Sequence, residues 1–185
     1  MGLLIALLRG VNVSGQKKIL MTDLRQLFAD AGFKDIQTYI QSGNVIFSSP
    51  NTSNPATIRS LIEQAIEKQY GFHVDVNILR PQDIKKILAN NPFLETGTDI
   101  TKLSVTILKA VPEKDKVVLL ATLDYPPDKF IYKDSLVYIQ CPNGFGRTKL
   151  SNNFFESKLK VSATSRNWRT LLKLDELSSH ASHSK

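Results

Sequence analysis

The most constraining feature of this sequence is the order in which two kinds of hydrophobic spacing follow each other in its first half. Residues 3–8 are continuously apolar, as in a central strand covered on both faces, and residues 72–78 alternate as in a half-buried strand. Between them, stretches with helical spacing at 24–31 and 58–66 enclose a strand hairpin over 36–47. The resulting order, β-α-β-β-α-β, is that of the ferredoxin-like fold.

Local residues predict where these elements begin and end. Asp23 is the expected N-cap of the first helix, and Gly32 is expected to follow its end. Asn54 followed by proline opens the second helix, and Gly71 ends it. Ser42 and the glycine after it predict the tight turn of the hairpin.

The second half repeats this order of elements without a visible sequence repeat. We expect its elements to be a strand at 103–108, a helix at 113–120, a hairpin of strands 130–132 and 136–140, a helix capped by Asn153 and Glu156, a short strand at 161–163 and a final helix containing Trp168.

The fold class predicted is therefore α+β, an α/β sandwich of two ferredoxin-like subdomains with a C-terminal helix. The subdomains span residues 1–80 and 102–177, a connecting helix and loop spans 81–101, and a disordered tail spans 178–185. Because the first strand is apolar on both faces, we expect the two subdomains to pack together rather than move on a linker.

Composition excludes several classes of protein. No apolar run approaches the roughly 18 residues that cross a bilayer, and residues 1–9 lack the basic start and cleavage site of a signal peptide. The single cysteine, Cys141, excludes an internal disulfide and suits a reducing compartment. We therefore expect a cytoplasmic protein that does not associate with membranes.

The sequence also argues against metal, cysteine and cofactor chemistry. The three histidines are His73, His180 and His183, and no His/Cys cluster has the spacing of metal ligands. Cys141 is expected to be a small buried hydrophobe rather than a nucleophile. We predict no metal site, no cofactor, and no metal-dependent or cysteine-dependent activity.

The loop 10–18 after the first strand comes close to a P-loop but is not one. Gln16 stands where the lysine belongs, and no Ser or Thr follows Lys17 to hold magnesium. A looser phosphate-binding role remains open, because a glycine loop before a helix directs amides and the helix dipole at an anion. The hairpin strands also lack the aromatic pattern of RNA-binding sheets.

The formal net charge is +7, and most of it lies in residues 145–173, where seven basic residues face one acidic residue, Glu156. Such a segment suits an anionic partner, whether a phosphate-bearing small molecule or a nucleic acid, but a solvated basic surface explains it equally well. Ordinary structural roles also account for several polar residues. Gly43 and Gly146 suit turns, Asn153 and Ser165 suit helix caps, and Trp168 suits a core.

Arg147, Lys149 and Arg166 are harder to explain by structure, since neither a turn nor a cap requires a cation. The candidate anion-binding residues are Arg9, Asn12, Lys17, Gln41, Ser42, Asn44, Arg147, Lys149, Arg166 and Asn167.

Four segments in order resemble the bacterial domain-of-unknown-function family 1697. They are Leu8–Val13, Tyr39–Val45, Gly146–Asn152 and Ala163–Trp168, and the resemblance extends to about Leu177. The family more often has tyrosine at the position of Phe145 and threonine at that of Ser165. The resemblance implies a two-part ferredoxin-like fold and a cytoplasmic bacterial protein, and it implies no activity.

Two functions are compatible with these residues. The first is a binding protein for an anionic, phosphate-bearing ligand such as a nucleotide or nucleic acid. The alternative is a small metal-independent enzyme acting on a phosphorylated or carboxylate metabolite. A single deep pocket that gathers the four segments favours the enzyme, and a flat basic surface favours nucleic acid.

Overall fold

The computed structural model describes residues 2–50, 54–94 and 97–183, and it confirms the α+β fold with two β-α-β-β-α-β units. The chain divides into two compact units, one formed by residues 1–86 with 173–185 and the other by residues 87–172. One division falls inside α3 (Pro81–Ala89) and the other inside α6 (Trp168–His183).

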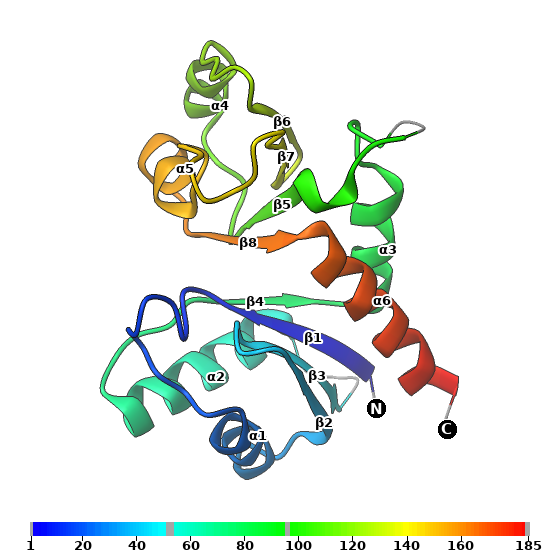
Figure 1. Cartoon of the computed structure of the whole chain (residues 1–185). Coiled ribbons are helices and arrows are strands. Elements are labelled where there is room, and N and C mark those ends of the chain that lie inside the picture. Colours follow the sequence, from blue (N-terminus) through cyan, green and yellow to red (C-terminus); the bar gives the residue numbers. More distant parts are fainter. Residues whose placement is uncertain (1, 51–53, 95–96, 184–185) are drawn as a thin grey trace. The chain divides into compact units, whose positions relative to one another are not determined.

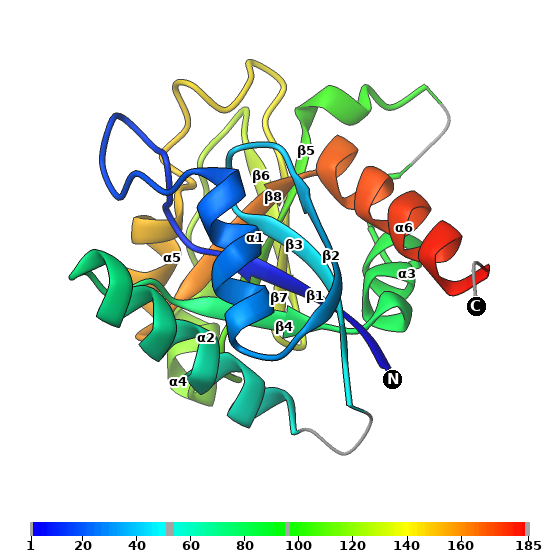
Figure 2. The same ribbon diagram turned by 90° about the horizontal axis from the view of Figure 1, so that it is seen from below.

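The first unit is an antiparallel sheet in the order β2-β3-β1-β4 with two helices on one face (Figure 1). Its elements are β1 (Gly2–Leu8), α1 (Met21–Asp30), β2 (Lys34–Tyr39), β3 (Asn44–Ser49), α2 (Pro55–Tyr70) and β4 (Val76–Leu79). Figure 2 shows α1 and α2 together in front of this sheet. The core between them includes three aromatic rings, Phe28, Phe33 and Phe47, whose centroids lie 4.7 to 5.7 Å apart.

The second unit has the same topology, with sheet order β6-β7-β5-β8. Its elements are a short 3-10 helix (Ile100–Lys102), β5 (Leu103–Leu108), α4 (Lys114–Ala121), β6 (Lys129–Lys133), β7 (Leu136–Gln140), α5 (Asn152–Leu159) and β8 (Ala163–Asn167). Its core gathers Val137, Ile139 and Cys141 from the sheet side and Phe155 and Leu159 from α5. The expected strand at 103–108 and the hairpin across Lys133-Asp134 are confirmed.

The two units share a pattern of backbone hydrogen bonds, although their sequences show no repeat. At the end of β1, the Leu8 N–H donates to Gly43 O (2.8 Å) and the Arg9 N–H to Asp75 O (2.9 Å). At the end of β5, the Leu108 N–H donates to Ser135 O and the Lys109 N–H to Ser162 O, both at 2.9 Å. These bonds make Arg9 equivalent to Lys109.

A second repeated device fixes the start of the last strand. Glu63 Oε1, on α2, accepts from the Val76 N–H at 2.9 Å, and Glu156 Oε1, on α5, accepts from the Ala163 N–H at 2.8 Å. Val76 and Ala163 are the first residues of β4 and β8. In both units, therefore, a helical carboxylate holds the entry to the edge strand.

Two helix starts differ from the sequence-based expectation. α1 begins at Met21 with Leu20 as its N-cap, and Asp23 lies in its first turn, where the helix dipole still favours a carboxylate. α5 is capped by Ser151, whose Oγ accepts from the Phe154 N–H, rather than by Asn153 with Glu156. The Glu156 carboxylate is instead engaged by the last strand, so it does not complete a capping box.

The C-terminal elements also differ. The last strand covers Ala163–Asn167 instead of 161–163, so Ser165 lies in a strand and is not a helix cap. α6 continues to His183, and residues 178–183 of the segment expected to be disordered are helical. Leu171, Leu174 and Ser178 recur at helical spacing and are all buried, which explains why the helix continues.

Both faces of β1 are buried, as its continuous apolar run predicts. Leu4, Ala6 and Leu8 belong to the core beneath α1 and α2, and Ile5 and Leu7 on the other face are fully buried. That the second half of the chain covers this second face stays a prediction. No helix within the described residues is long and apolar enough to cross a membrane.

Gly43 offers a test of the close packing at the end of β1. Its φ is +74°, and an added Cβ would lie 2.7 Å from both Leu8 Cβ and Val11 Cγ2. Gly43→Ala should therefore lower the free energy of unfolding by about 2–4 kcal/mol, measured by urea denaturation followed by circular dichroism.

Gly15→Ala is the matched control, because Gly15 also has a positive φ (+75°) but no atom lies within 4 Å of its added Cβ. Gly15→Ala should lower the free energy of unfolding by only about 1–2 kcal/mol, the cost of placing an alanine at a positive φ. Equal losses for the two variants would contradict the close approach at Gly43.

Candidate anion-binding site

The structure distributes the ten candidate residues over both units. Six of them lie in the first unit, where β1 ends and the β2–β3 turn begins: Arg9, Asn12, Lys17, Gln41, Ser42 and Asn44. The other four lie in the second unit, with Arg147 and Lys149 in the connection from β7 to α5 and Arg166 and Asn167 in β8.

In the first unit, the loop 10–18 forms a small hairpin rather than a phosphate loop. The Gln16 N–H donates to Val13 O (2.9 Å), and the two residues between them, Ser14 and Gly15, both have positive φ, as in a type I′ turn. The Asn12 N–H closes the hairpin by donating to Lys17 O at 3.2 Å. Ile19 and Leu20 then separate it from the first turn of α1.

The Asn12 side chain holds this hairpin to the neighbouring turn. Its Nδ2 donates to Ile19 O (2.9 Å) and Gln41 O (2.8 Å), and its Oδ1 accepts from the Ile19 N–H (2.9 Å). Both of its amide hydrogens are therefore used by backbone carbonyls. This arrangement gives Asn12 a structural role.

Asn44 and Ser42 have a similar role in the β2–β3 turn. Asn44 is fully buried, and its Nδ2 donates to Tyr39 O and to Ser42 Oγ, both at 3.0 Å. Lys17 reaches another connection, where its Nζ donates to His73 O at 2.6 Å. The polar residues of this end of the first unit thus bind three loops to one another.

The second unit contains a pocket that two of the candidate cations line. It has a volume of about 300 Å³ and is lined by Tyr125, Pro126, Pro127, Asp128, Asn143, Gly144, Arg147, Thr148 and Lys149. The Arg147 and Lys149 side chains are exposed, whereas those of Tyr125 and Asp128 are partly buried. The wall of the pocket therefore includes two cations, one carboxylate and one aromatic ring.

Buried residues anchor both ends of the loop that carries the cations. Cys141 is fully buried, and its N–H donates to Lys102 O at 2.9 Å. Leu150 is 3% exposed, and its N–H donates to Thr148 Oγ1 at 3.1 Å. The loop between these anchors is therefore attached at both ends to the core of its unit.

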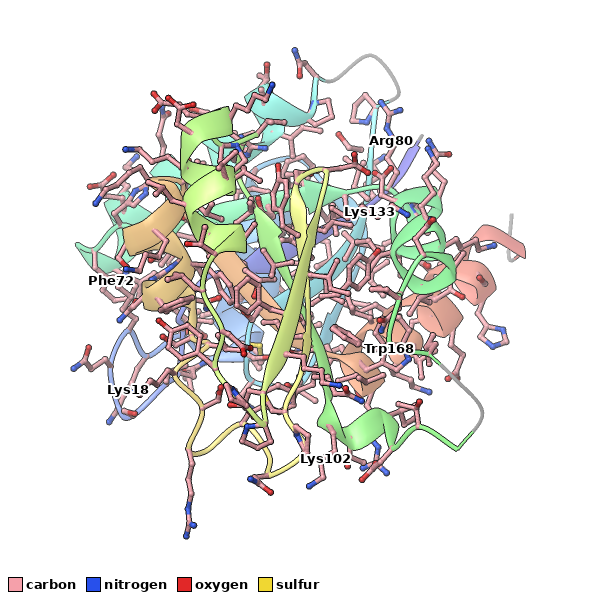
Figure 3. The ribbon with its side chains drawn as sticks, turned by 90° about the horizontal axis from the view of Figure 1, so that it is seen from above. Lys18, Phe72, Arg80, Lys102, Lys133 and Trp168 are labelled. Carbon is pink, nitrogen blue, oxygen red and sulfur yellow. The ribbon has the colours of Figure 1, made fainter. Side chains whose placement is uncertain are left out.

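Lys102 brings a third cation to this loop. Its Nζ lies 4.0 Å from the place a Cβ would occupy on Gly144, and Figure 3 shows it beside the loop. Sequence reasoning missed Lys102, Tyr125 and Asp128, because they come from other segments and no motif includes them. Only the fold brings Tyr125 and Asp128 to the pocket that Arg147 and Lys149 line, and Lys102 to Gly144 in the same lining.

Arg166 and Asn167 do not line this pocket. Arg166 is 7% exposed, and its Nη1 donates to Ser165 O at 2.9 Å. Burial lowers the pKa of its guanidinium to about 10, so it remains charged at neutral pH. Asn167 ends β8, where it pairs with Ser104.

A larger pocket, of about 540 Å³, lies in the first unit and is lined by residues of α1, its C-cap Ala31 and α2. Its charged lining residues are Asp30 and Lys68, and the others are apolar or carry amides: Leu27, Ala31, Leu61, Gln64, Ala65 and Gln69. This balance of charge does not select an anion. The smaller pocket in the second unit is therefore the better candidate.

Cys141 provides a test of this local structure. Burial raises the pKa of its thiol, and a hydrogen bond with Thr148 lowers it by less. The native protein should therefore react with an alkylating reagent far more slowly than the urea-unfolded chain, as mass spectrometry can measure. Equal rates in the two states would contradict the buried anchor.

Comparisons with known proteins support the fold and the family. The conserved bacterial protein SP0830 from Streptococcus pneumoniae is similar in structure, with a TM-score of 0.71 at 20% sequence identity, over 94% of this chain and 97% of that one. No curated protein matches the sequence. The model of a family described as "Protein of unknown function (DUF1697)" matches residues 1–138, which include the first two of the four resembling segments. The chain therefore belongs to the DUF1697 family.

Proposed function

We propose that this protein binds a small phosphate-bearing ligand, in particular a mononucleotide, in the second-unit pocket that Arg147 and Lys149 line. The observation that carries the proposal is that Arg147 and Lys149 line the same pocket of about 300 Å³. An arginine guanidinium pairs with two phosphate oxygens at once, and a lysine adds a point charge. Lys102, beside Gly144, increases the positive potential there.

The rest of the lining suits a nucleoside better than a bare phosphate. Tyr125 packs edge-on against Phe154, with ring centroids 5.3 Å apart, and it contributes to the pocket wall. An aromatic ring at a pocket wall is a surface on which a base can stack. The Asp128 carboxylate repels phosphate but accepts hydrogen bonds from ribose hydroxyls or from a base amine.

The size of the pocket favours a small ligand over a nucleic acid. Its volume lies at the lower end of the range of about 300–1,000 Å³ that is typical of small-molecule sites. A nucleic acid instead requires a row of cations along an extended groove. We therefore infer that Arg147 and Lys149 of the basic segment contact a small ligand in the pocket, and that the segment does not form a long nucleic-acid interface.

Titration calorimetry with purine and pyrimidine mononucleotides at low salt tests the proposal. Arg147→Ala and Lys149→Ala should each weaken binding about 10- to 100-fold, since one charge-assisted hydrogen bond contributes about 1.5–3 kcal/mol. Inorganic phosphate should compete. The salt dependence should be shallow, whereas a polyanion loses about 0.7–0.9 log units per phosphate for each tenfold rise in salt.

Lys158→Ala is the matched control, because Lys158 is exposed in the same basic segment but does not line the pocket. It should leave the affinity unchanged. Failure of every nucleotide to bind, or equal binding by the Arg147 and Lys158 variants, would overturn the proposal.

A further inference from the structure

A second group of polar side chains lies in the first unit, far along the chain from the pocket described above. Glu63, His73 and Asp75 each offer a possible metal-ligating atom, and these three atoms all lie within 4.8 Å of one another. Glu63 belongs to α2, while His73 and Asp75 lie in the connection from α2 to β4. Helix and connection thus bring one imidazole and two carboxylates to one place.

The fold positions Glu63 in advance. Its Oε1 accepts from the Val76 N–H at 2.9 Å, which holds the carboxylate at the entry to β4. The equivalent Glu156 makes the same bond in the second unit, where Ser162 takes the place of Asp75. In the second unit, Val161 and Ser162 alone connect the C-cap of α5 to β8. A connection without a histidine and an aspartate therefore forms the same fold, so the fold itself does not require His73 and Asp75.

The distances suit a bound cation better than direct hydrogen bonds. His73 Nε2 lies 3.5 Å from Asp75 Oδ1, beyond the range of about 2.7–3.2 Å for an N–H···O bond. Ligand bonds of about 2.0–2.1 Å in tetrahedral geometry place two ligand atoms about 3.3 Å apart. The pair is therefore spaced for a metal ion between the two atoms.

The charges around the imidazole also favour a cation. Asp75 lies on the Nε2 side, and Glu67 Oε2 lies 3.9 Å from Nδ1 on the other side. The Lys17 ammonium donates to the His73 carbonyl oxygen at 2.6 Å, and so it is bonded to the backbone of this residue. The His73 side chain is 52% exposed, so water can complete the coordination.

We propose that Glu63, His73 and Asp75 form a binding site for a divalent transition-metal ion such as Zn²⁺. One imidazole nitrogen with two carboxylates suits zinc and its neighbours, whereas Mg²⁺ and Ca²⁺ prefer oxygen ligands alone. The proposal departs from the sequence-based expectation of no metal site. That expectation rested on His and Cys spacing, which does not reveal one histidine beside two acids from different elements.

The test is calorimetric titration of the full chain with Zn²⁺ after chelator treatment, with Co²⁺ absorption as a spectroscopic measure. The background for all variants carries His180→Ala and His183→Ala, which removes the other two histidines of the chain. We expect one Zn²⁺ per chain. His73→Ala and Asp75→Asn should each weaken binding at least tenfold and abolish the Co²⁺ spectrum.

Asp124→Asn, an exposed carboxylate in the second unit, is the matched control and should bind Zn²⁺ as the background does. Circular dichroism of each variant shows that the fold is retained. The proposal is overturned if Zn²⁺ does not bind, if His73→Ala binds it equally well, or if Mg²⁺ and Ca²⁺ compete at similar concentrations. The last result would indicate only a patch of negative charge.

Discussion

The hydrogen bonds that extend the ladder beyond the end of each central strand determine where the loops of this protein lie. In the first unit, the Leu8 and Arg9 N–H groups bond to Gly43 O and Asp75 O. These two bonds attach the hairpin turn and the start of β4 to the same end of β1. The close approach at Gly43 and the position of His73 and Asp75 beside α2 both depend on them.

The same topology separates the polar segments within their units. The loop 10–18 and the turn at Gly43 lie where the central strand β1 ends. The segment with Arg147 follows β7, which is antiparallel to β5, and the pairing of Gln140 with Leu103 places it where β5 begins. The loop 10–18 and the turn at Gly43 therefore lie at the edge of the first sheet where its central strand ends. The segment with Arg147 lies at the edge of the second sheet where its central strand begins. Glu63, His73 and Asp75 therefore meet in the first unit, and the pocket lined by Arg147 and Lys149 lies in the second.

Burial and pairing divide the basic segment into side chains with different roles. Lys173 Nζ pairs with Glu176 at 2.6 Å, and Arg166 is buried in its unit's edge strand. Lys160 adopts a left-handed conformation (φ +57°) as the C-cap of α5. Arg147 and Lys149 remain as the two cations of the segment that line a described pocket. Charge density along the sequence is thus a poor guide to charge density at a site, because helix and strand geometry direct neighbouring side chains to different places.

Local residue patterns were enough to predict the class and the order of the elements. The apolar run at 3–8, the alternation at 72–78 and the helix stop at Gly71 depend on spacing and local backbone preference, which are properties of neighbouring residues. The ends of elements were less predictable. Ser151 caps α5 by accepting from the Phe154 N–H, whereas Glu156, expected to take part in a capping box, accepts from the Ala163 N–H of the last strand. Three contacts appear only in the folded chain: Asn12 binds backbone carbonyls of two loops, Lys102 approaches Gly144, and Glu63 lies beside His73. Each of these contacts joins residues from separate elements, so its existence depends on strand pairing and helix packing that no local pattern specifies.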